Sequence, residues 1–237
     1  MPKQHEGSVN AEERPAVARP RREPLTRTRI IQTALKIMDE EGLEAVTMRR
    51  IGRELEVEAM SLYNHVEDKE DILDGVASLI MSKFRDLEPT DDWRADAREA
   101  AWEWRRVLLL HPSAITLFAE RNKPIEDADG VRPMETALDV IRRAGLSVRD
   151  AVQAFHAFGG YIMGFVMMEH GLMLGPEHPD PEQIQAQQRL AEMLQAGNFP
   201  RLLEALPYFL ECSCDLQFEF GVDLMIRGLE AKAAASS

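Results

Sequence analysis

The sequence predicts an all-α protein in which a small N-terminal domain of three helices precedes a larger helical domain. Apolar residues recur three and four positions apart through most of the chain, and no segment alternates apolar and polar residues as a strand does. With 237 residues, the chain can bury a large core without disulfides or metals. We expect an N-terminal arm over 1–24, the small domain over 25–70 and the larger domain over 71–237.

The formal net charge is −13, but the charge is unevenly distributed. Basic residues exceed acidic ones by one in 1–24, whereas acidic residues exceed basic ones by three in 25–70 and by eleven in 71–237. An acidic body repels nucleic acid, because binding phosphates requires basic side chains. This distribution is typical of a protein that touches nucleic acid with its N-terminal part only.

The chain shows no apolar segment of the kind found in a secretory signal peptide and no apolar run of about 18 residues. Its longest apolar stretch, 154–168, is interrupted by a histidine and two glycines, and we interpret it as a buried helix or a subunit contact rather than a membrane span. Cys212 and Cys214 would point about 200° apart on a helix, so no disulfide between them is expected. We expect a reduced, cytoplasmic protein without membrane contact.

The arm over 1–24 contains four of the 13 prolines and almost no large apolar side chains, so we expect it to be disordered. Its basic stretch from Arg19 to Arg22 could follow a phosphate backbone or enter a minor groove, or it could be a solvated tail. The sequence leaves both interpretations open.

Helical periodicity begins after the arm and predicts four consecutive helices. The first starts at Thr26 and ends before Gly42, a residue that suits the position after a helix C-terminus. Thr47 and Asp68 are good N-caps for the second and fourth helices. The fourth helix is expected over Lys69–Leu87 and would join the two domains.

The second and third helices, expected over Thr47–Leu55 and Glu58–Val66, suit a helix-turn-helix. Gly52 is small where these two helices must approach each other closely. The exposed face of the third helix is expected to carry Ala59, Met60, Ser61, Tyr63 and Asn64. Side chains of these kinds can meet phosphates, base edges and thymine methyl groups in a major groove.

The stretch from Thr28 to Leu73 resembles the DNA-binding domain of the TetR (tetracycline repressor) family of transcriptional repressors. Its most specific part is Ser61-Leu62-Tyr63-Asn64-His65-Val66 followed by Lys69, which is similar to the family pattern T-L-Y-x-H-F/V-x-x-K. The resemblance implies that Arg49 reaches a base edge and that bases are faced by Ala59, Met60 and Ser61. It also implies that the DNA backbone is held by Thr47, Met48, Tyr63, His65 and Lys69.

These side chains also have structural interpretations. Arg49 could be solvated, the ring of Tyr63 could cover the core, and the histidine could end a helix. The family usually has glycine where Glu56 stands, so either this glutamate adopts a left-handed conformation or the turn differs. With Glu54 and Glu58, it would place negative charge near the DNA, which predicts weak nonspecific binding and a strong dependence on salt.

Helical periodicity continues through the larger domain. Helices are expected over Asp91–Leu110, from the break at His111-Pro112 to Glu120, and over Val131–Ala144, Ser147–Gly171 and Leu216–Leu229. Prolines and glutamines between Leu174 and Phe199 favour a mobile loop around a weak helix.

From Trp93 onward the chain is similar, less specifically, to the C-terminal domain of the tetracycline-repressor-like branch. The similarity includes Leu108-Leu109-Leu110-His111-Pro112 and Phe218-Glu219-Phe220-Gly221-Val222-Asp223. It implies a homodimer in which two long helices of each subunit, here 147–171 and 216–229, form a four-helix bundle. The alternative is that their surplus of apolar residues packs inside one subunit.

The same resemblance implies a ligand cavity among the middle helices. Candidate lining residues are Trp104, Phe118, Met134, Leu138, Phe155, Phe158, Tyr161 and Met168, although any one of them could instead belong to the core. The positions aligned with the family's metal–tetracycline site hold Phe118, Ala100, Ala137, Gly160 and Met168, which offer no ligands to a hydrated magnesium ion. We therefore expect an apolar or aromatic effector, with no metal and no cofactor.

The expected function is that of a ligand-responsive DNA-binding regulator, and the family implies repression at a palindromic operator by a homodimer. Effector binding would disfavour the spacing of the two recognition helices that DNA requires, with the fourth helix as the lever. The main alternative is a helical protein-interaction module without sequence-specific DNA binding. An enzyme is not expected, because the sequence has no glycine-rich phosphate loop, nucleophile elbow or Cys–His ligand set.

Overall fold

The computed structural model describes residues 24–121, 123–125, 127–170, 181–210 and 213–236. These residues form eleven α-helices and one short 3-10 helix, and this part of the chain contains no strand. The helices are α1 (Arg27–Glu41), η1 (Leu43–Ala45, the 3-10 helix), α2 (Met48–Glu54), α3 (Ala59–Leu62), α4 (Lys69–Met81), α5 (Trp93–Leu110), α6 (Ala114–Glu120), α7 (Ala128–Arg143), α8 (Val148–His170), α9 (Pro181–Ala196), α10 (Pro200–Leu210) and α11 (Cys214–Ser236). The predicted all-α class is confirmed. All of the predicted arm except its last residue lies outside the described residues.

The N-terminal domain consists of α1, α2 and α3, in which α2 packs against both α1 and α3, and α1 packs against α4. The side chains of Thr26 and Thr47 accept hydrogen bonds from the backbone N–H groups of Arg29 (3.2 Å) and Arg50 (3.1 Å), which fixes where α1 and α2 begin. The fully buried side chains of its core include Ile30, Ala34, Ile37, Met38, Ile51, Leu62 and Ile72. Burial of each large apolar side chain contributes roughly 1.5–3 kcal/mol, so this core can hold the short helices in place.

α3 is shorter than the sequence predicted. The helix was expected over Glu58–Val66, but it ends at Leu62, and residues 63–65 form a turn. The backbone N–H groups of His65 (2.9 Å) and Val66 (3.1 Å) both donate to the Leu62 carbonyl. Because Val66 is buried, the chain turns back toward the core at this point instead of continuing along the helix axis.

α4 ends at Met81 and not at Leu87 as predicted, and residues 82–92, here called the connection, lead to α5. The backbone N–H and the guanidinium of Arg85 donate to the carboxylate of Glu103 on α5, at 2.7 and 2.8 Å. Glu103 is only 1% exposed, and a buried carboxylate without partners would be strongly destabilising. The hydrogen bonds to Glu103 therefore account for the departure of the chain from the helical path.

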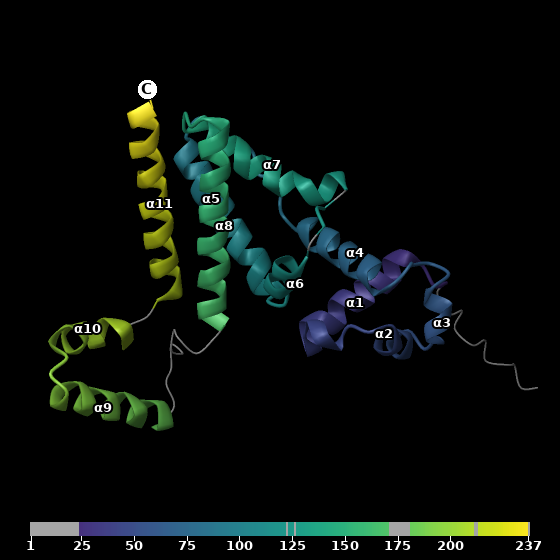
Figure 1. The fold of residues 1–237 in the computed structure, drawn as a ribbon, viewed down its shortest axis with the longest axis horizontal. Coiled ribbons are helices and arrows are strands. Elements are labelled where there is room, and N and C mark those ends of the chain that lie inside the picture. Colours follow the sequence, from purple (N-terminus) through teal and green to yellow (C-terminus); the bar gives the residue numbers. More distant parts are fainter. Residues whose placement is uncertain (1–23, 122, 126, 171–180, 211–212, 237) are drawn as a thin grey trace, which may run out of the picture.

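α5, α7 and α8 form the centre of the larger domain, and α11 lies along α8 and α5 (Figure 1). α4 packs against both α1 and α7, so it joins the two parts of the molecule. By length and hydropathy alone, Val148–Glu169 in α8 could cross a membrane, which by itself is weak evidence for a span. Here this helix contacts α5, α7 and α11, as a core helix of a helical protein does.

A buried arginine joins α5 to the ends of α8 and α11. Arg105 donates to Glu169 on α8 (2.6 and 3.0 Å) and to Asp215 on α11 (2.8 Å). Its guanidinium also lies over the rings of Trp102 and Phe218, 4.9 and 5.2 Å from their centroids. Arg105 therefore holds together the two places at which the chain leaves the bundle after α8 and returns at α11.

The stretch Leu174–Phe199, expected to be a mobile loop around a weak helix, contains α9, a helix of 16 residues. The unpredicted α10 follows and packs against it. Residues 171–180 lie outside the described part of the chain. Figure 1 shows α9 and α10 set apart from the other helices. The other predicted helices are present with shifted ends, and α11 continues to Ser236.

Candidate DNA-binding surface and ligand cavities

The turn between α2 and α3 orients the candidate DNA-binding surface. A Cβ atom on Gly52 would lie 3.0 Å from the Val57 carbonyl oxygen and 3.3 Å from the backbone of Ala59, so a larger residue would force the two helices apart. Glu56 has a φ of 55°, in the left-handed region. The glutamate therefore adopts the left-handed conformation, which was the first of the two alternatives for this position. This conformation carries roughly 1–2 kcal/mol of backbone strain.

The residues expected to meet DNA lie on one continuous segment that runs from the N-cap of α2 to the start of α4. The exposed ones are Thr47, Arg49, Met60, Tyr63, Asn64 and His65, and the half-buried ones are Met48, Ala59, Ser61 and Lys69. Met60 is 74% exposed and Tyr63 is 47% exposed, and no other large apolar side chain within 24–87 is exposed. With half of its surface in solvent, Tyr63 does not serve mainly to cover the core.

Some charged side chains of α2 form ion pairs within the domain, and others are exposed to solvent. Arg50 donates to Glu41 (2.6 Å) and Glu54 (2.8 Å), and Lys36 donates to Glu54 (2.8 Å). Hydrogen bonds from Lys36 and then from Arg50 lower the pKa of Glu54 to about 2. The charge of Glu54 is thus balanced within the domain. Of the two adjacent arginines, Arg50 is engaged there, whereas Arg49 points its charge toward solvent.

Polar contacts hold α1 and α4 against the segments that follow α5 and α6. After α5, His111 Nδ1 lies 2.9 Å from Asp39 Oδ2, and Ser113 Oγ donates to a backbone carbonyl of α1 (3.1 Å). After α6, Arg121 is paired with Asp74 on α4. A rearrangement in the larger domain can therefore change the orientation of the N-terminal domain.

An almost entirely apolar cavity of about 60 Å³, here called the apolar cavity, lies between α5, α7 and α8. Three predicted ligand residues line it: Trp104, Phe155 and Phe158. The lining residues that were not predicted as ligand contacts are Ala97, Ala100, Ala101, Ala137, Val140, Ile141, Gly159 and Ile162, although Ala100 and Ala137 were aligned with the family's metal–tetracycline site. For the lining residues of α5, the sequence signal is the spacing of Ala97, Ala100 and Ala101, because small residues three and four positions apart leave space on one face of a helix.

The other predicted ligand residues lie elsewhere. Phe118, Met134 and Leu138 are half-buried and are absent from the lining of the apolar cavity. Tyr161 faces α11, where its hydroxyl donates to the backbone carbonyl of residue 218 at 2.9 Å, and Met168 is partly in solvent. A role for these five residues in ligand binding stays a prediction. Among the described residues, no group of three or more His, Cys, Asp or Glu side chains is arranged to hold a metal ion.

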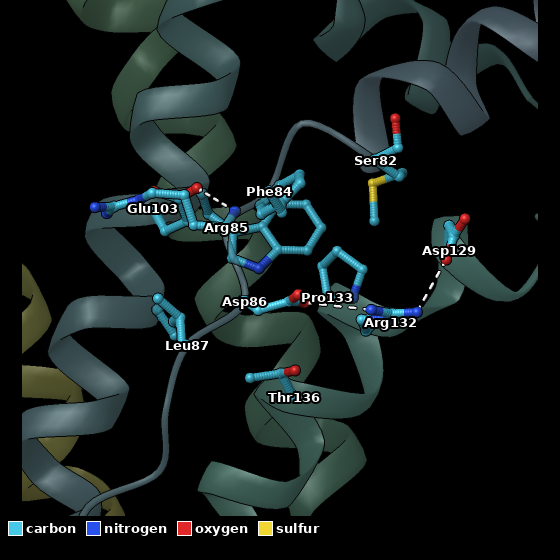
Figure 2. A pocket seen from close by; sticks show the side chains of 13 residues that line it. Ser82, Phe84, Arg85, Asp86, Leu87, Glu103, Asp129, Arg132, Pro133 and Thr136 are labelled. Atoms are coloured by element: carbon cyan, nitrogen blue, oxygen red, sulfur yellow. Dashed lines mark hydrogen bonds and ion pairs between the residues drawn. The ribbon is translucent and has the colours of Figure 1, made fainter.

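A second cavity of about 170 Å³, here called the hinge cavity, lies where the connection meets α5 and α7 (Figure 2). It is lined by Met81, Ser82, Phe84, Arg85, Asp86 and Leu87 from the end of α4 and the connection, by Ala100, Glu103 and Trp104 from α5, and by Asp129, Arg132, Pro133 and Thr136 from α7. Its walls carry charges, unlike those of the apolar cavity. Ala100 and Trp104 line both cavities.

Glu103 lines the hinge cavity, and its carboxylate is held in place by hydrogen bonds. Burial raises its pKa, but hydrogen bonds from Arg106 and Arg85 outweigh burial and lower the pKa to about 2. The Arg106 guanidinium donates to the two carboxylate oxygens at 2.6 and 2.8 Å. Glu103 is therefore ionised and fully bonded at neutral pH.

α8 and α11 leave large apolar side chains in solvent. These are Val148, Val152, Met167 and Met168 on α8 and Leu216, Phe220 and Leu224 on α11. Leu216, Phe220 and Leu224 are 74%, 67% and 55% exposed and lie four residues apart, so they share one face of α11. These residues do not pack inside one subunit, which was the alternative interpretation. A contiguous apolar face of this kind is typical of a protein interface.

Known proteins match both parts of the chain. The family model described as bacterial regulatory proteins, tetR family, matches residues 30–76, and the tetracyclin repressor-like, C-terminal domain matches residues 86–233. An HTH-type transcriptional regulator of Saccharopolyspora erythraea is 31% identical over 181 residues, which cover 74% of this chain and 75% of that protein. The class D tetracycline repressor protein of Escherichia coli is 27% identical over 217 residues, which cover 89% and 92%.

A solved structure shows the same arrangement of helices. The TetR family protein ActR of Streptomyces coelicolor, in complex with actinorhodin, superposes with a TM-score of 0.76 at 28% identity and covers 90% of this chain and 99% of its own. These similarities confirm the predicted family and do not favour a protein-interaction module. The chain therefore belongs to the TetR family of transcriptional regulators, and it is a ligand-responsive, DNA-binding regulator.

Proposed function

We propose that this regulator is a cytoplasmic repressor that binds a palindromic operator as a homodimer and leaves it when an apolar or aromatic effector binds. The main support is the face formed by α2 and α3. Buried Ile51 and Leu62 fix both helices on the core, while Arg49, Met60 and Tyr63 stand in solvent on the other side. The chain then acts by binding and not as an enzyme, in keeping with relatives that are transcriptional regulators.

In this proposal the side chains of the face divide into base readers and backbone contacts. The guanidinium of Arg49 can donate two hydrogen bonds to one guanine, and bases are also met by Ala59, Met60 and Ser61. Phosphates and sugars are contacted by Thr47, Met48, Tyr63, Asn64, His65 and Lys69. The Thr47 hydroxyl already accepts a hydrogen bond from the Arg50 N–H, but its own hydrogen can still be donated to a phosphate.

A homodimer would cover the apolar face of α8 and α11. Leu216, Phe220 and Leu224 form a continuous stripe on α11, and exposed apolar residues of α8 accompany it. Pairing with a second copy removes both stripes from water and produces a four-helix bundle with two-fold symmetry. A two-fold dimer presents two recognition helices to two half-sites, which is why a palindromic operator is expected.

The apolar cavity supports the proposed effector chemistry. Its walls are alanine, valine, isoleucine and aromatic side chains, and a charged ligand would lose its hydration there without compensation. The related ActR structure contains actinorhodin, so a TetR family protein of this shape accepts a ligand. An apolar or aromatic effector of this chain would enter next to Trp104, Phe155 and Phe158.

Selection of binding sites from random double-stranded DNA by the full chain tests the proposal. We expect enrichment of sites with two-fold symmetry. Arg49→Ala should then weaken the best sites by about 1–3 kcal/mol and relax the preference at one base position in each half-site. Lys69→Ala should weaken all sites alike and reduce the salt dependence by about one ion.

Arg201→Ala is a matched control, because Arg201 is an exposed arginine on α10, far from the helix-turn-helix in sequence. It should leave both affinity and base preference unchanged. Enrichment of no sequence, or of sites without symmetry, would contradict the proposal. Unchanged binding by both the Arg49 and the Lys69 variants would show that the face of α2 and α3 is not the DNA-binding surface.

A further inference from the structure

The apolar cavity and the hinge cavity share two wall residues, Trp104 and Ala100. Of these two, Trp104 has the large side chain. On the side of the hinge cavity, the ring of Phe84 meets the indole edge-to-face, with the ring centroids 4.5 Å apart. A shift of Trp104 would therefore join the two cavities and would at the same time remove the support of Phe84.

Neither cavity alone has the size of an effector site. The apolar cavity holds about 60 Å³ and the hinge cavity about 170 Å³. A cavity of about 150 Å³ accepts benzene, whereas sites for larger ligands usually hold about 300–1,000 Å³. A ligand with two or more fused rings thus needs both cavities, and it can occupy both only after Trp104 has moved.

The hinge cavity offers one cation that a ligand can recruit. The guanidinium of Arg132 lies 2.9 Å from Asp129 and 3.5 Å from Asp86. Dashed lines mark these two pairs in Figure 2. All three side chains are more than half exposed, and such exposed ion pairs contribute little stability. Arg85, in contrast, is held by the buried Glu103. Arg132 can therefore turn to a ligand, and a guanidinium prefers a carboxylate or another anionic oxygen.

The same side chains connect the cavity to α4. Phe84 and Asp86 belong to the connection that directly follows α4, and their partners Trp104 and Arg132 belong to α5 and α7. A ligand that displaces the indole and recruits the guanidinium replaces both contacts. Arg85, which lies between Phe84 and Asp86 in sequence, would keep its hydrogen bonds to the buried Glu103 and would remain in place.

We propose that the two cavities form one bipartite effector site for a fused aromatic ring system that carries an anionic oxygen, a carboxylate or a phenolate. The rings extend from the apolar cavity into the space that Trp104 leaves, the oxygen binds Arg132, and binding acts on α4 by releasing Phe84 and Asp86. The regulatory part of this inference rests on the proposed function, because α4 carries the signal to the DNA-binding surface.

Calorimetric titration of the full chain tests the ligand chemistry, with 2-naphthoic acid as the probe and naphthalene-2-carboxamide as its uncharged counterpart. We expect the acid to bind about tenfold more tightly than the amide. Arg132→Gln should abolish this preference. Arg201→Gln is the matched control, since Arg201 also pairs with an acidic residue three positions away on an exposed helix face, and it should retain the preference.

Amide hydrogen exchange with and without 2-naphthoic acid tests the coupling. We expect faster exchange in the last turn of α4 and at residues 86–88 when the probe is bound. The Arg85 amide, which donates to Glu103, should stay protected. Unchanged exchange in the connection would overturn the coupling. Equal affinities for acid and amide, or no saturable binding of the acid at millimolar concentration, would overturn the bipartite site.

Neither measurement contains DNA, so the two proposals fail separately. A chain that enriches symmetric sites but shows no preference for the acid refutes the bipartite site and leaves the repressor proposal intact. A chain that binds the acid through Arg132 but enriches no DNA sequence refutes the repressor proposal alone.

Discussion

The N-terminal domain and the larger domain differ in how completely they bury their apolar side chains. Within 24–87, Met60 and Tyr63 are the exposed large apolar residues, and both lie on the candidate DNA-binding surface. The larger domain exposes a stripe on α11 and part of α8, and two cavities interrupt its interior. A single subunit thus buries most large apolar side chains of the N-terminal domain, whereas the larger domain leaves an apolar surface that a second subunit could cover.

This difference suits the two tasks of the molecule. A densely packed unit transmits a change of orientation without deforming, because packed cores have discrete arrangements. A domain with cavities and a movable partition can be remodelled by a ligand. Substitutions in the N-terminal domain should therefore change its own stability or its DNA contacts, whereas substitutions in the larger domain should change assembly and ligand response.

The largest effect is expected at the apolar face of the larger domain. In the double variant Phe220→Glu/Leu224→Glu, a dimer would bury two carboxylates per subunit without partners, at a cost of several kcal/mol. We expect the chain to sediment as a monomer at micromolar concentration. Operator affinity should fall more than about 100-fold, because each half-site would then be bound separately.

Sedimentation equilibrium and gel-shift titration measure the two effects. Leu110→Glu is the control, because Leu110 is also an exposed apolar residue but stands at the end of α5. It should leave the chain dimeric. If the wild-type chain sedimented as a monomer, the apolar face of α8 and α11 would not be a subunit interface, and the proposed difference between the two domains would be wrong.

The next largest effect is expected at Glu103, where the two domains meet. Its ordinary pKa is 4.5 and its pKa in the folded chain is about 2, so the unfolded chain binds the proton first as pH falls. The stabilisation is complete above pH 4.5 and is lost as pH falls toward 2. Glu103→Gln should therefore lower the free energy of unfolding by about 2–3 kcal/mol at neutral pH and by much less near pH 2.

Urea unfolding at neutral and acidic pH measures this difference. Glu99→Gln, an exposed position on the same helix, is the control and should behave as wild type at both pH values. If Glu103→Gln destabilised the chain equally at neutral pH and near pH 2, its carboxylate would not be the group that holds the connection.

A smaller loss of stability is expected in the N-terminal domain at Gly52. An added Cβ meets backbone atoms at 3.0 and 3.3 Å, and backbone cannot yield as a flexible side chain can. Gly52→Ala gains about 1 kcal/mol in helix propensity but loses more by overpacking, which leaves a net loss of about 1–2 kcal/mol. Urea unfolding checks this. Arg53→Ala, exposed on the same helix, reports the effect of a new alanine without a close contact and should not destabilise.

The N-terminal domain was largely predictable because its signals are local. Thr47 caps α2, and Gly52 stands at the close approach, as expected. α10 was missed and α9 was expected only as a weak helix, although each begins with a proline, Pro181 and Pro200. Proline is favourable at the first helical position, so both prolines mark where these helices start.

The cavities were less predictable, because their walls come from elements far apart in sequence. Trp104, Phe155 and Phe158 were expected at a cavity and line it, whereas Tyr161, only three residues after Phe158, faces α11. The hinge cavity could not be foreseen at all, since the sequence predicted that α4 would continue to Leu87. The chain leaves the helical path where Arg85 bonds the buried Glu103 and where Arg106 donates to the Lys83 carbonyl, and the sequence pattern does not show these contacts between elements.

The smallest effect is expected at Glu56, where two substitutions distinguish the contribution of backbone strain from that of charge. Glu56→Gly relieves the left-handed strain but gives the unfolded chain more freedom, so the free energy of unfolding should rise by only about 0.5 kcal/mol. Glu56→Gln keeps the strain, so it should not show this rise. Both variants remove a negative charge beside the candidate DNA-binding surface, so both should raise operator affinity about two- to threefold at low salt and less at high salt.

Urea unfolding and salt-dependent gel-shift titration distinguish the two contributions. If only Glu56→Gly raised the affinity, the position of α3, and not the charge, would limit binding, and the N-terminal domain would be adjustable instead of rigid. If both variants raise the operator affinity equally, the negative charge of Glu56, and not its backbone conformation, limits the affinity. An acidic residue at this position then lowers the affinity that an effector must overcome to release the operator.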